Sequence, residues 1–224
     1  MNQTVENFRS RDYWIVENAL YIEPSFRLKK CAQVINGLAG RRECSLLDAG
    51  CGPAALEPLL DKNVSYYGID IAIHKPAPNL REVDIARETI AWGNQRFDFV
   101  VALGFFEYMG HQQKLKLEEI RAILKPGGKY MMSYINFGHF RRKVWPNYNN
   151  VQTIDSMTKG LEEVFRVDKR FPASHNWRQK QPGKRSLQGL QMKVNFDIPV
   201  VSSLTAVEYF FLCSRPEDPV SPVR

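Results

Sequence analysis

Cysteine is scarce in this chain of 224 residues, and its four copies lie far apart. They are Cys31, Cys44, Cys51 and Cys213, and no two of them form a C-x-x-C pair. Zinc sites and thiol redox motifs depend on such pairs, so we expect no metal site. We expect reduced thiols, with Cys51 present for its small size rather than for catalysis or redox chemistry.

Long apolar runs are also missing. No segment reaches the length of a membrane span, and the first residues, Met1 to Asn7, lack a basic region followed by an apolar stretch. We therefore expect a cytoplasmic protein without membrane contact. There are no internal repeats, and 44% hydrophobic with 25% charged residues is typical of one globular domain at this length.

Acidic residues are sparse between Asn136 and Val200, where 12 Lys and Arg stand against 5 Asp and Glu. The difference, 12 − 5 = +7, equals the net charge of the whole chain. This local excess favours an anionic partner, such as a carboxylate or phosphate substrate, an acidic protein or nucleic acid. A well-solvated basic face is the alternative.

One short apolar run is followed by two glycines, in the stretch Ser45-Leu46-Leu47-Asp48-Ala49-Gly50-Cys51-Gly52-Pro53. It predicts a buried parallel strand and a tight turn. Gly50 and Gly52 lack Cβ, so a ligand can approach the backbone closely. Pro53 suits the first position of a helix, which we expect over residues 54–60 with local strain at Pro58.

A second predicted strand, Val64 to Asp70, ends in a carboxylate 22 residues after Asp48. A carboxylate about 20 residues beyond the first strand is where nucleotide-binding folds hold a ribose diol. The two stretches together predict a nucleoside site. The pattern differs from the dinucleotide fingerprint, because Asp48 precedes the first glycine and Ala54 replaces a later one.

These motifs resemble those of the class I S-adenosylmethionine-dependent methyltransferases, whose first motif runs acidic-x-Gly-x-Gly-x-Gly. The copy here runs from Asp48 to Ala54. Asp84 matches the acidic residue near the adenine, residues 97–104 match the fourth strand, and residues 124–129 match the turn before the fifth. The cofactor implied is S-adenosyl-L-methionine. The fold implied is α/β: a Rossmann-like, seven-stranded, mostly parallel sheet with helices on both faces and an antiparallel last strand.

The resemblance also implies roles for single residues. The methionyl part would face Asp48 and the turn at Gly50, Cys51 and Gly52. The backbone of Leu103 and Gly104 would lie near it, Asp70 would accept the ribose hydroxyls, and the adenine would meet Asp84, Ile85 and Ile71.

The remaining pattern predicts how the chain is organised. A helical cap is expected over residues 1–40 and a methyltransferase core over 41–214, with a basic substrate-cap insertion at about 173–203 and a flexible tail at 215–224. Strands are expected at 44–49, 64–70, 80–85, 97–104, 128–136, 166–171 and 204–213. Further helices are expected at 111–125 and 153–165.

The substrate side is less defined. A general base, if one is needed, is expected among Glu107, Tyr108, His111 and His139, although each has a structural alternative such as helix capping. Substrate contacts are expected from the aromatic residues Tyr13, Trp14, Tyr21 and Trp145 and from Arg141 and Arg178. The aromatics of the N-terminal helices are alternatively core residues.

Three functions remain open. The first is a methyltransferase that acts on an O, N or C atom of a small metabolite, with an anionic metabolite as one option. Residues 136–141 and 149–154 also resemble the MetW branch of the family, which implies an accessory role beside an acyltransferase. An RNA-modifying enzyme is third, because the Asn/Asp-Pro-Pro-aromatic motif of base-amine methyltransferases is absent after the fourth strand. A monomer or a homodimer is compatible with all three.

Overall fold

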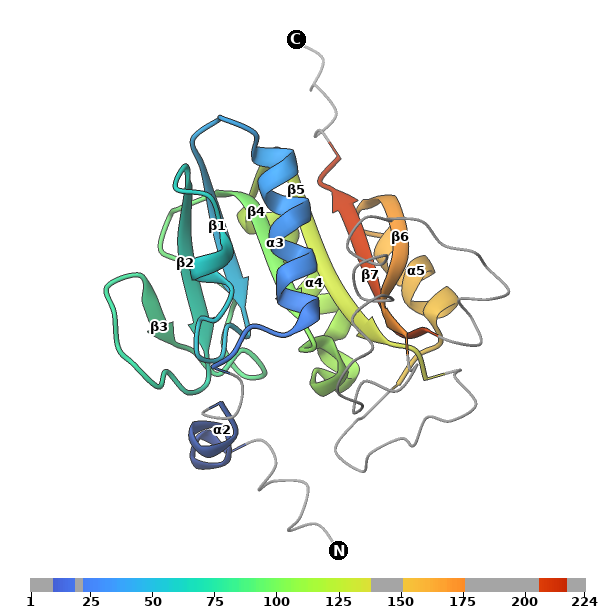
Figure 1. Ribbon diagram of the computed structural model, residues 1–224. Coiled ribbons are helices and arrows are strands. Elements are labelled where there is room, and N and C mark those ends of the chain that lie inside the picture. Colours follow the sequence, from blue (N-terminus) through green and yellow to red (C-terminus); the bar gives the residue numbers. More distant parts are fainter. Residues whose placement is uncertain (1–9, 19–21, 138–150, 176–205, 217–224) are drawn as a thin grey trace, which may run out of the picture.

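The computed structural model describes residues 10–18, 22–137, 151–175 and 206–216. Within these residues, seven strands form one sheet in the order β3-β2-β1-β4-β5-β7-β6 (Figure 1). The strands are β1 Cys44–Ala49, β2 Val64–Asp70, β3 Leu80–Glu82, β4 Phe97–Leu103, β5 Leu124–Ile135, β6 Arg166–His175 and β7 Ala206–Ser214. The first five are paired in parallel, whereas β7 runs antiparallel to both β5 and β6. The expected fold class is confirmed, including the antiparallel last strand.

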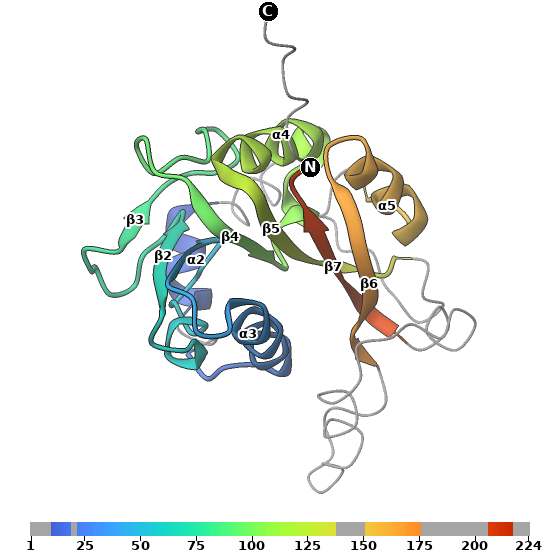
Figure 2. The ribbon, with the colours of Figure 1, turned by 90° about the horizontal axis from the view of Figure 1, so that it is seen from above.

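Helices cover both faces of the sheet (Figure 2). Helix α3, Phe26–Ala39, packs on one face, where its residues Cys31 and Ile35 join a buried cluster with β1 and β4. Helices α4, Gln113–Ile123, and α5, Ile154–Glu162, pack on the other face and share a second cluster. The two clusters explain why the strands read as almost continuous apolar runs, since a parallel sheet buries both of its faces.

Local sequence signals set the helix ends. Helix α3 begins after Ser25, whose hydroxyl accepts from the N–H of Leu28 at 3.4 Å, and α5 begins after Thr153, which accepts from Ser156 at 3.1 Å. Helix α2, Arg11–Asn18, precedes α3. Both helices fall within the N-terminal region that was expected to be helical, on either side of Pro24.

The prediction of a helix over residues 54–60 is wrong. Residues 52–56 form turns, and only a short 3₁₀ helix, η2 Glu57–Leu59, follows. Pro58 has no N–H to donate to an α-helical hydrogen bond, and Ala54 adopts φ +58°, outside the right-handed helical region. A left-handed conformation costs a residue with a Cβ about 1–2 kcal/mol. Ala54 thus adopts a left-handed conformation at the position where the motif has a glycine.

The other elements are close to those expected. Helix α4 ends at Ile123 and β5 begins at Leu124, so the turn through Pro126 and Gly127 lies inside the strand. Strand β3 stops at Glu82, three residues before its expected end, and β6 continues to His175. Most of the expected insertion at 173–203 and most of the tail at 215–224 lie outside the described residues.

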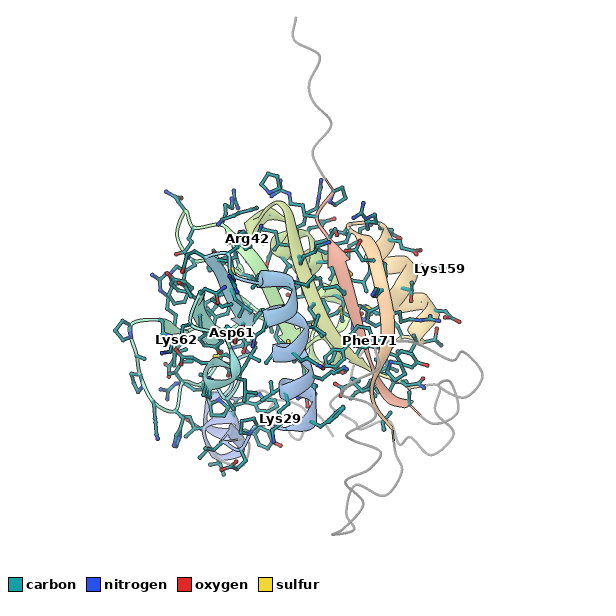
Figure 3. The ribbon with its side chains drawn as sticks, turned by 45° about the horizontal axis from the view of Figure 1, so that its top comes forward. Lys29, Arg42, Asp61, Lys62, Lys159 and Phe171 are labelled. Carbon is teal, nitrogen blue, oxygen red and sulfur yellow. The ribbon has the colours of Figure 1, made fainter. Side chains whose placement is uncertain are left out.

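Charged side chains occupy the outside of the layers. Figure 3 shows Lys29 on α3 and Lys159 on α5, together with Asp61 and Lys62 in the turn that precedes β2. Phe171 of β6, by contrast, is buried and packs on Phe210 of β7, with ring centroids 5.3 Å apart. Over the described part of the chain, the helices are too short or too polar to span a bilayer.

Gly68 of β2 gives a test of how tightly this sheet holds the turn after β1. A Cβ on Gly68 would lie 2.8 Å from Sγ of Cys51 and 2.8 Å from Cδ2 of Leu80. We expect Gly68→Ala to lower the free energy of unfolding by about 1–3 kcal/mol, the usual cost of overpacking. Chemical denaturation measures this change.

Gly160 in α5 is the matched control, because a Cβ there meets no atom within 4 Å. Gly160→Ala should raise the free energy of unfolding by up to about 1 kcal/mol through helix propensity. Equal effects of the two substitutions would contradict the packing that we describe around Gly68.

Candidate functional site

The strand order reverses between β1 and β4, because β2 and β3 extend the sheet on one side of β1 and β4 continues it on the other. In open α/β sheets, ligands bind outside the carboxyl ends of the strands at such a reversal. The turns after β1, β2 and β4 meet at this edge, and α2 lies beside it (Figure 1). The turns that carry the expected cofactor residues Gly50, Asp70 and Gly104 therefore belong to one region of the molecule.

The turn after β1 is tied to the end of β2. The N–H groups of Gly50 and Cys51 both donate to the carbonyl of Ile69, at 2.8 and 3.1 Å. Gly50 has φ +79°, and a Cβ there would lie 3.1 Å from the ring of Phe105. Conformation and space both require glycine at this position.

Asp70 joins two turns at the end of β2. One carboxylate oxygen accepts from the N–H of Gly52 at 2.8 Å, and the other accepts from the N–H of Ala72 at 3.1 Å. Its side chain is nearly buried, with 8% of the residue exposed. These two bonds fix the position of the Asp70 carboxylate at the carboxyl end of β2.

Asp48 is a second buried carboxyl at the same edge. Its Oδ2 accepts from the hydroxyl of Tyr66 at 2.9 Å. Burial raises the pKa of Asp48 to about 7; Asp70 adds to the rise, whereas the hydrogen bond from Tyr66 opposes it. A carboxyl that ionises near neutral pH in such a place is a candidate binding group for a cation.

Cys51 is buried between these carboxyls. Burial, followed by the charges of Asp48 and Asp70, raises the pKa of its thiol well above the ordinary value. A thiol of this kind is not a nucleophile at neutral pH. The packing against Gly68 instead agrees with the expected role of Cys51 as a small side chain in the turn.

The residues that follow β3 form a turn in which Asp84 binds its own neighbours. Asp84 accepts from the N–H of Ala86 at 3.2 Å and lies 3.4 Å from the guanidinium of Arg87. Ile85 is buried in the core cluster, whereas Ile71 is partly exposed. Of these predicted residues, Asp84 and Ile71 retain surface that a ligand could contact.

On the β4 side, Leu103 is buried and Gly104 turns the chain with φ +68°. The N–H of Gly104 donates to Oγ of Ser133 at 2.8 Å. A Cβ at Gly104 would collide with the guanidinium of Arg27 from α3, whose Cζ would lie 2.9 Å away. The positive φ of Gly104 favours glycine here, whereas the contact with Arg27 involves the end of a flexible side chain that can shift.

Arg27 pairs with Glu208 across the carboxyl edge, with Nη1 of the arginine 2.8 Å from Oε1 of the glutamate. The two side chains are 32% and 12% exposed, so the pair is largely shielded from water. Sequence reasoning missed both residues. Glu208 leaves a weak signal, as a single acidic residue in the apolar strand β7, whereas Arg27 leaves none, because its partner lies 181 positions away.

Glu107 follows β4 in the 3₁₀ helix η3, Phe106–Tyr108, and is fully buried. Its Oε1 accepts from the N–H of Ile135 at 2.9 Å, whereas its Oε2 has no hydrogen-bond partner among the described residues. Burial, with a further contribution from Glu208, raises the pKa of Glu107 to about 7.

Helix α2 is held against this edge by two contacts. Trp14 meets Tyr108 edge to face, with ring centroids 5.4 Å apart, and Tyr13 packs in the same way on Trp14 at 5.2 Å. Nη2 of Arg11 lies 2.9 Å from Oε1 of Glu82, at the end of β3. Two of the predicted substrate residues, Tyr13 and Trp14, therefore lie beside the predicted base Tyr108.

Of the other predicted residues on the substrate side, the structure describes only His111. His111 lies in the short helix η4, Gly110–Gln112, with an exposed side chain. The predictions for Tyr21, His139, Arg141, Trp145 and Arg178 lie outside the described residues. Within the described ranges, no group of three or more His, Cys, Asp or Glu residues is arranged to hold a metal ion.

Comparison with known proteins adds to this geometry. A family model described as "Methyltransferase domain" matches residues 24–181, which is 158 of the 224 residues and so more than half of the chain. No curated protein matches the chain.

Solved structures share the fold at low identity. A SAM dependent methyltransferase from Archaeoglobus fulgidus is 15% identical with a TM-score of 0.62, over 85% of this chain and 95% of its own. The N-methyltransferase NodS from Bradyrhizobium japonicum WM9, in complex with S-adenosyl-L-homocysteine, is 16% identical with a TM-score of 0.57, over 96% and 98%. The [4+2]-cyclase SpnF is 15% identical with a TM-score of 0.56, over 83% and 81%.

The raised pKa of Asp48 gives a prediction for stability against pH. Between about pH 4 and pH 7, the folded protein holds a proton that the unfolded chain has released, because the pKa rises on folding from 3.8 to about 7. Stability should therefore fall as pH rises through this window, by up to about 1.4 kcal/mol per pH unit for each such carboxyl. We expect Asp48→Asn to reduce this slope, as measured by urea denaturation from pH 5 to 8.

Glu107 should contribute to the same slope for the same reason, because its pKa also rises to about 7. The double variant Asp48→Asn, Glu107→Gln should lose more of the slope than either single variant. A slope that is identical in the parent and in all three variants would show that neither carboxyl is neutralised by folding.

Proposed function

The chain belongs to the methyltransferase-domain family and is an S-adenosylmethionine-dependent methyltransferase, and on this premise we propose that it transfers the methyl group to a small metabolite. The observation that carries the proposal is the convergence of the glycine turn with the carboxylates of Asp48 and Asp70 at the reversal of the strand order. The acceptor atom, O, N or C, belongs to the proposal rather than to the family assignment.

The charge of this edge fits the cofactor. S-Adenosylmethionine has a sulfonium, an ammonium and a carboxylate, so it is a net cation. The edge has the buried carboxyls of Asp48, Asp70 and Glu107, and the nearby arginine, Arg27, is already paired with Glu208. A surplus of buried carboxyls favours a positively charged ligand.

We assign the cofactor contacts accordingly. Asp48 and the backbone at Gly50 and Gly52 would hold the methionyl part, and the carboxylate of Asp70 at the end of β2 would accept the ribose hydroxyls. Asp84 and Ile71 would meet the adenine. In this assignment Ile85 supports the turn from the core, because its side chain is buried.

The bound sulfonium makes its methyl group electrophilic, so the protein's task is to align the acceptor and to keep water away. Trp14 of α2 packs on Tyr108 beside the carboxyl edge, and Tyr13 of the same helix packs on Trp14. Three of the base candidates that sequence suggested are described: Glu107 is buried, Tyr108 is partly exposed beside Trp14, and the side chain of His111 is exposed.

Two other roles compete with this proposal. An accessory role, as the likeness to the MetW branch implies, would leave the cofactor fold without turnover of its own. An RNA-modifying role would depend on the basic residues of 136–200, which lie largely outside the described ranges. The fold does not decide between them, since the similar SpnF is a [4+2]-cyclase.

Binding of S-adenosylhomocysteine, measured by isothermal titration calorimetry, is the first test. We expect a complex, and a gain in stability of roughly 2.7 kcal/mol at one hundred times the dissociation constant. Absence of both heat and thermal shift would contradict the assigned site.

Asp70→Asn tests the ribose contact. A hydrogen bond to a charged group contributes about 1.5–3 kcal/mol, so the substitution should weaken binding about ten- to a hundredfold. Because Asp70 also holds the turn, the parent and the variant are each titrated with S-adenosylhomocysteine and with its 2′-deoxy analogue. Asp70→Asn should lose the parent's preference for S-adenosylhomocysteine over the 2′-deoxy analogue. The control Asp61→Asn, at an exposed position, should keep this preference. An unchanged preference in Asp70→Asn would place the ribose elsewhere.

The acceptor class is tested by incubation with methyl-labelled cofactor and either a metabolite extract or total RNA. We expect label in a small product. Label in RNA would favour the nucleic-acid role, and absence of label in both, despite cofactor binding and with a co-purifying protein, would favour the accessory role.

A further inference from the structure

A second group of charged residues lies on the side of the strand reversal away from Asp70. Glu107 follows β4 and reaches the end of β5, where Ile135 is the cross-strand partner of Glu208 on β7. Most of the predicted cofactor contacts follow β1, β2 and β3, and the last of them, Leu103 and Gly104, lie at the end of β4. The turn after β4 therefore divides the edge into two parts. The strands β4, β5 and β7 border the part that remains for an acceptor.

Glu107 lies in this acceptor part of the edge, and one of its carboxylate oxygens, Oε2, accepts no hydrogen bond from the described residues. It is fully buried, its Oε1 is held by the N–H of Ile135, and its Oε2 has no hydrogen-bond partner in the described part of the chain. A buried carboxylate oxygen without a donor is unfavourable, because water no longer solvates it. Such an atom points to a missing donor, which a ligand can supply.

The neighbouring charges set the kind of ligand. Around Glu107 lie Glu208 on β7, Arg27 on α3 and the hydroxyls of Tyr130 and Tyr134 on β5. The positive charge of Arg27 is already paired with Glu208 at 2.8 Å. A carboxylate or phosphate placed here would face uncompensated negative charge, whereas a positively charged group would be attracted.

We propose that Glu107 receives the proton of an amine acceptor, and that Glu208, held by Arg27, keeps this subsite acidic. The proposal rests on the proposed function and narrows it to N-methylation of an amine. Glu107 is the group that contacts the acceptor, and Glu208 is a positioning residue. The rest of the acceptor can still be anionic, since this inference concerns only the nitrogen that is methylated.

The reaction balances with the groups present. An ammonium acceptor gives one proton to Oε2 of Glu107 and so regains its lone pair. The nitrogen then forms a bond to the methyl carbon while the carbon–sulfur bond breaks, with its electron pair left on sulfur. The products are a methylammonium, a neutral thioether and a protonated Glu107, which returns its proton to water. A pKa near 7 suits Glu107 to both proton steps at neutral pH.

Sinefungin tests the proposal without knowledge of the natural acceptor. In this cofactor analogue, a carbon atom that bears a protonated amine replaces the sulfonium and its methyl group. The amine therefore occupies the position of the methyl group that the cofactor transfers. S-Adenosylhomocysteine has the same adenosine and the same α-ammonium but lacks this amine. The ratio of the two dissociation constants therefore reports on the acceptor side alone.

We expect the parent to bind sinefungin about ten- to a hundredfold more tightly than S-adenosylhomocysteine, the range of a charge-assisted hydrogen bond. Glu107→Gln keeps an oxygen for the N–H of Ile135 but removes the charge, so it should lose most of this preference while its affinity for S-adenosylhomocysteine stays within about twofold. Glu208→Gln should lose part of the preference. Glu118→Gln, on the exposed side of α4, should keep all of it.

The outcomes separate this inference from the proposed function. If S-adenosylhomocysteine does not bind to the parent, the assigned cofactor site fails. If it binds and the parent has no preference for sinefungin, or if the preference survives both Glu107→Gln and Glu208→Gln, the acidic acceptor subsite is wrong. Far-ultraviolet circular dichroism and a cooperative melt establish that each variant is folded, and a folding failure of Glu107→Gln leaves Glu208→Gln to decide.

The chemistry of the labelled product gives an independent check. Once the labelled cofactor has been separated from the product, label that is stable to mild base is expected, because an N-methyl amine does not hydrolyse. Label released as methanol by mild base would show transfer to a carboxylate and would overturn the proposal.

Discussion

The carboxylate of Asp70 is the constraint on which the carboxyl edge depends. It accepts from the N–H of Gly52 in the turn after β1 and from the N–H of Ala72 in the turn after β2, so two turns share one anchor. The carbonyl of Ile69 fixes the same turn from the adjacent residue, through Gly50 and Cys51. Both turns are irregular backbone, and buried backbone groups there need partners. The site is thus preorganised by hydrogen bonds from β2 rather than by a following helix.

A second theme is the imbalance of buried charge. Asp48 and Glu107 are buried with pKa values raised to about 7, and Arg27 has Glu208 as its partner. A structure selected for stability alone would avoid buried carboxyls with so little compensation, because their desolvation is costly. A cationic ligand relieves this cost, so the imbalance couples binding to protonation and to stability. The same electrostatic argument links the family's cofactor to the amine acceptor that we propose.

The sequence predicted the framework of this site well and its substrate side poorly. Runs of apolar residues identified the strands, and the glycine turn with Asp70 identified the edge, because these signals depend on neighbours in the chain. The helix expected after Pro53 does not form, since Pro58 and the left-handed Ala54 oppose it. A motif therefore located the turn correctly even though the local structure that follows it differs from the pattern.

Sequence alone determined the α/β class, the order of the strands along the chain and the position of Asp48, Gly50 and Asp70 at strand ends. Only the tertiary structure decided which distant side chains meet there. Arg27 and Glu208 come together because α3 packs on one face of the sheet and β7 inserts between β5 and β6. Glu107 gains its raised pKa only when it is buried beside them. Such contacts join residues up to 181 positions apart, and no local pattern encodes them, because burial and charge pairing depend on the packed fold as a whole.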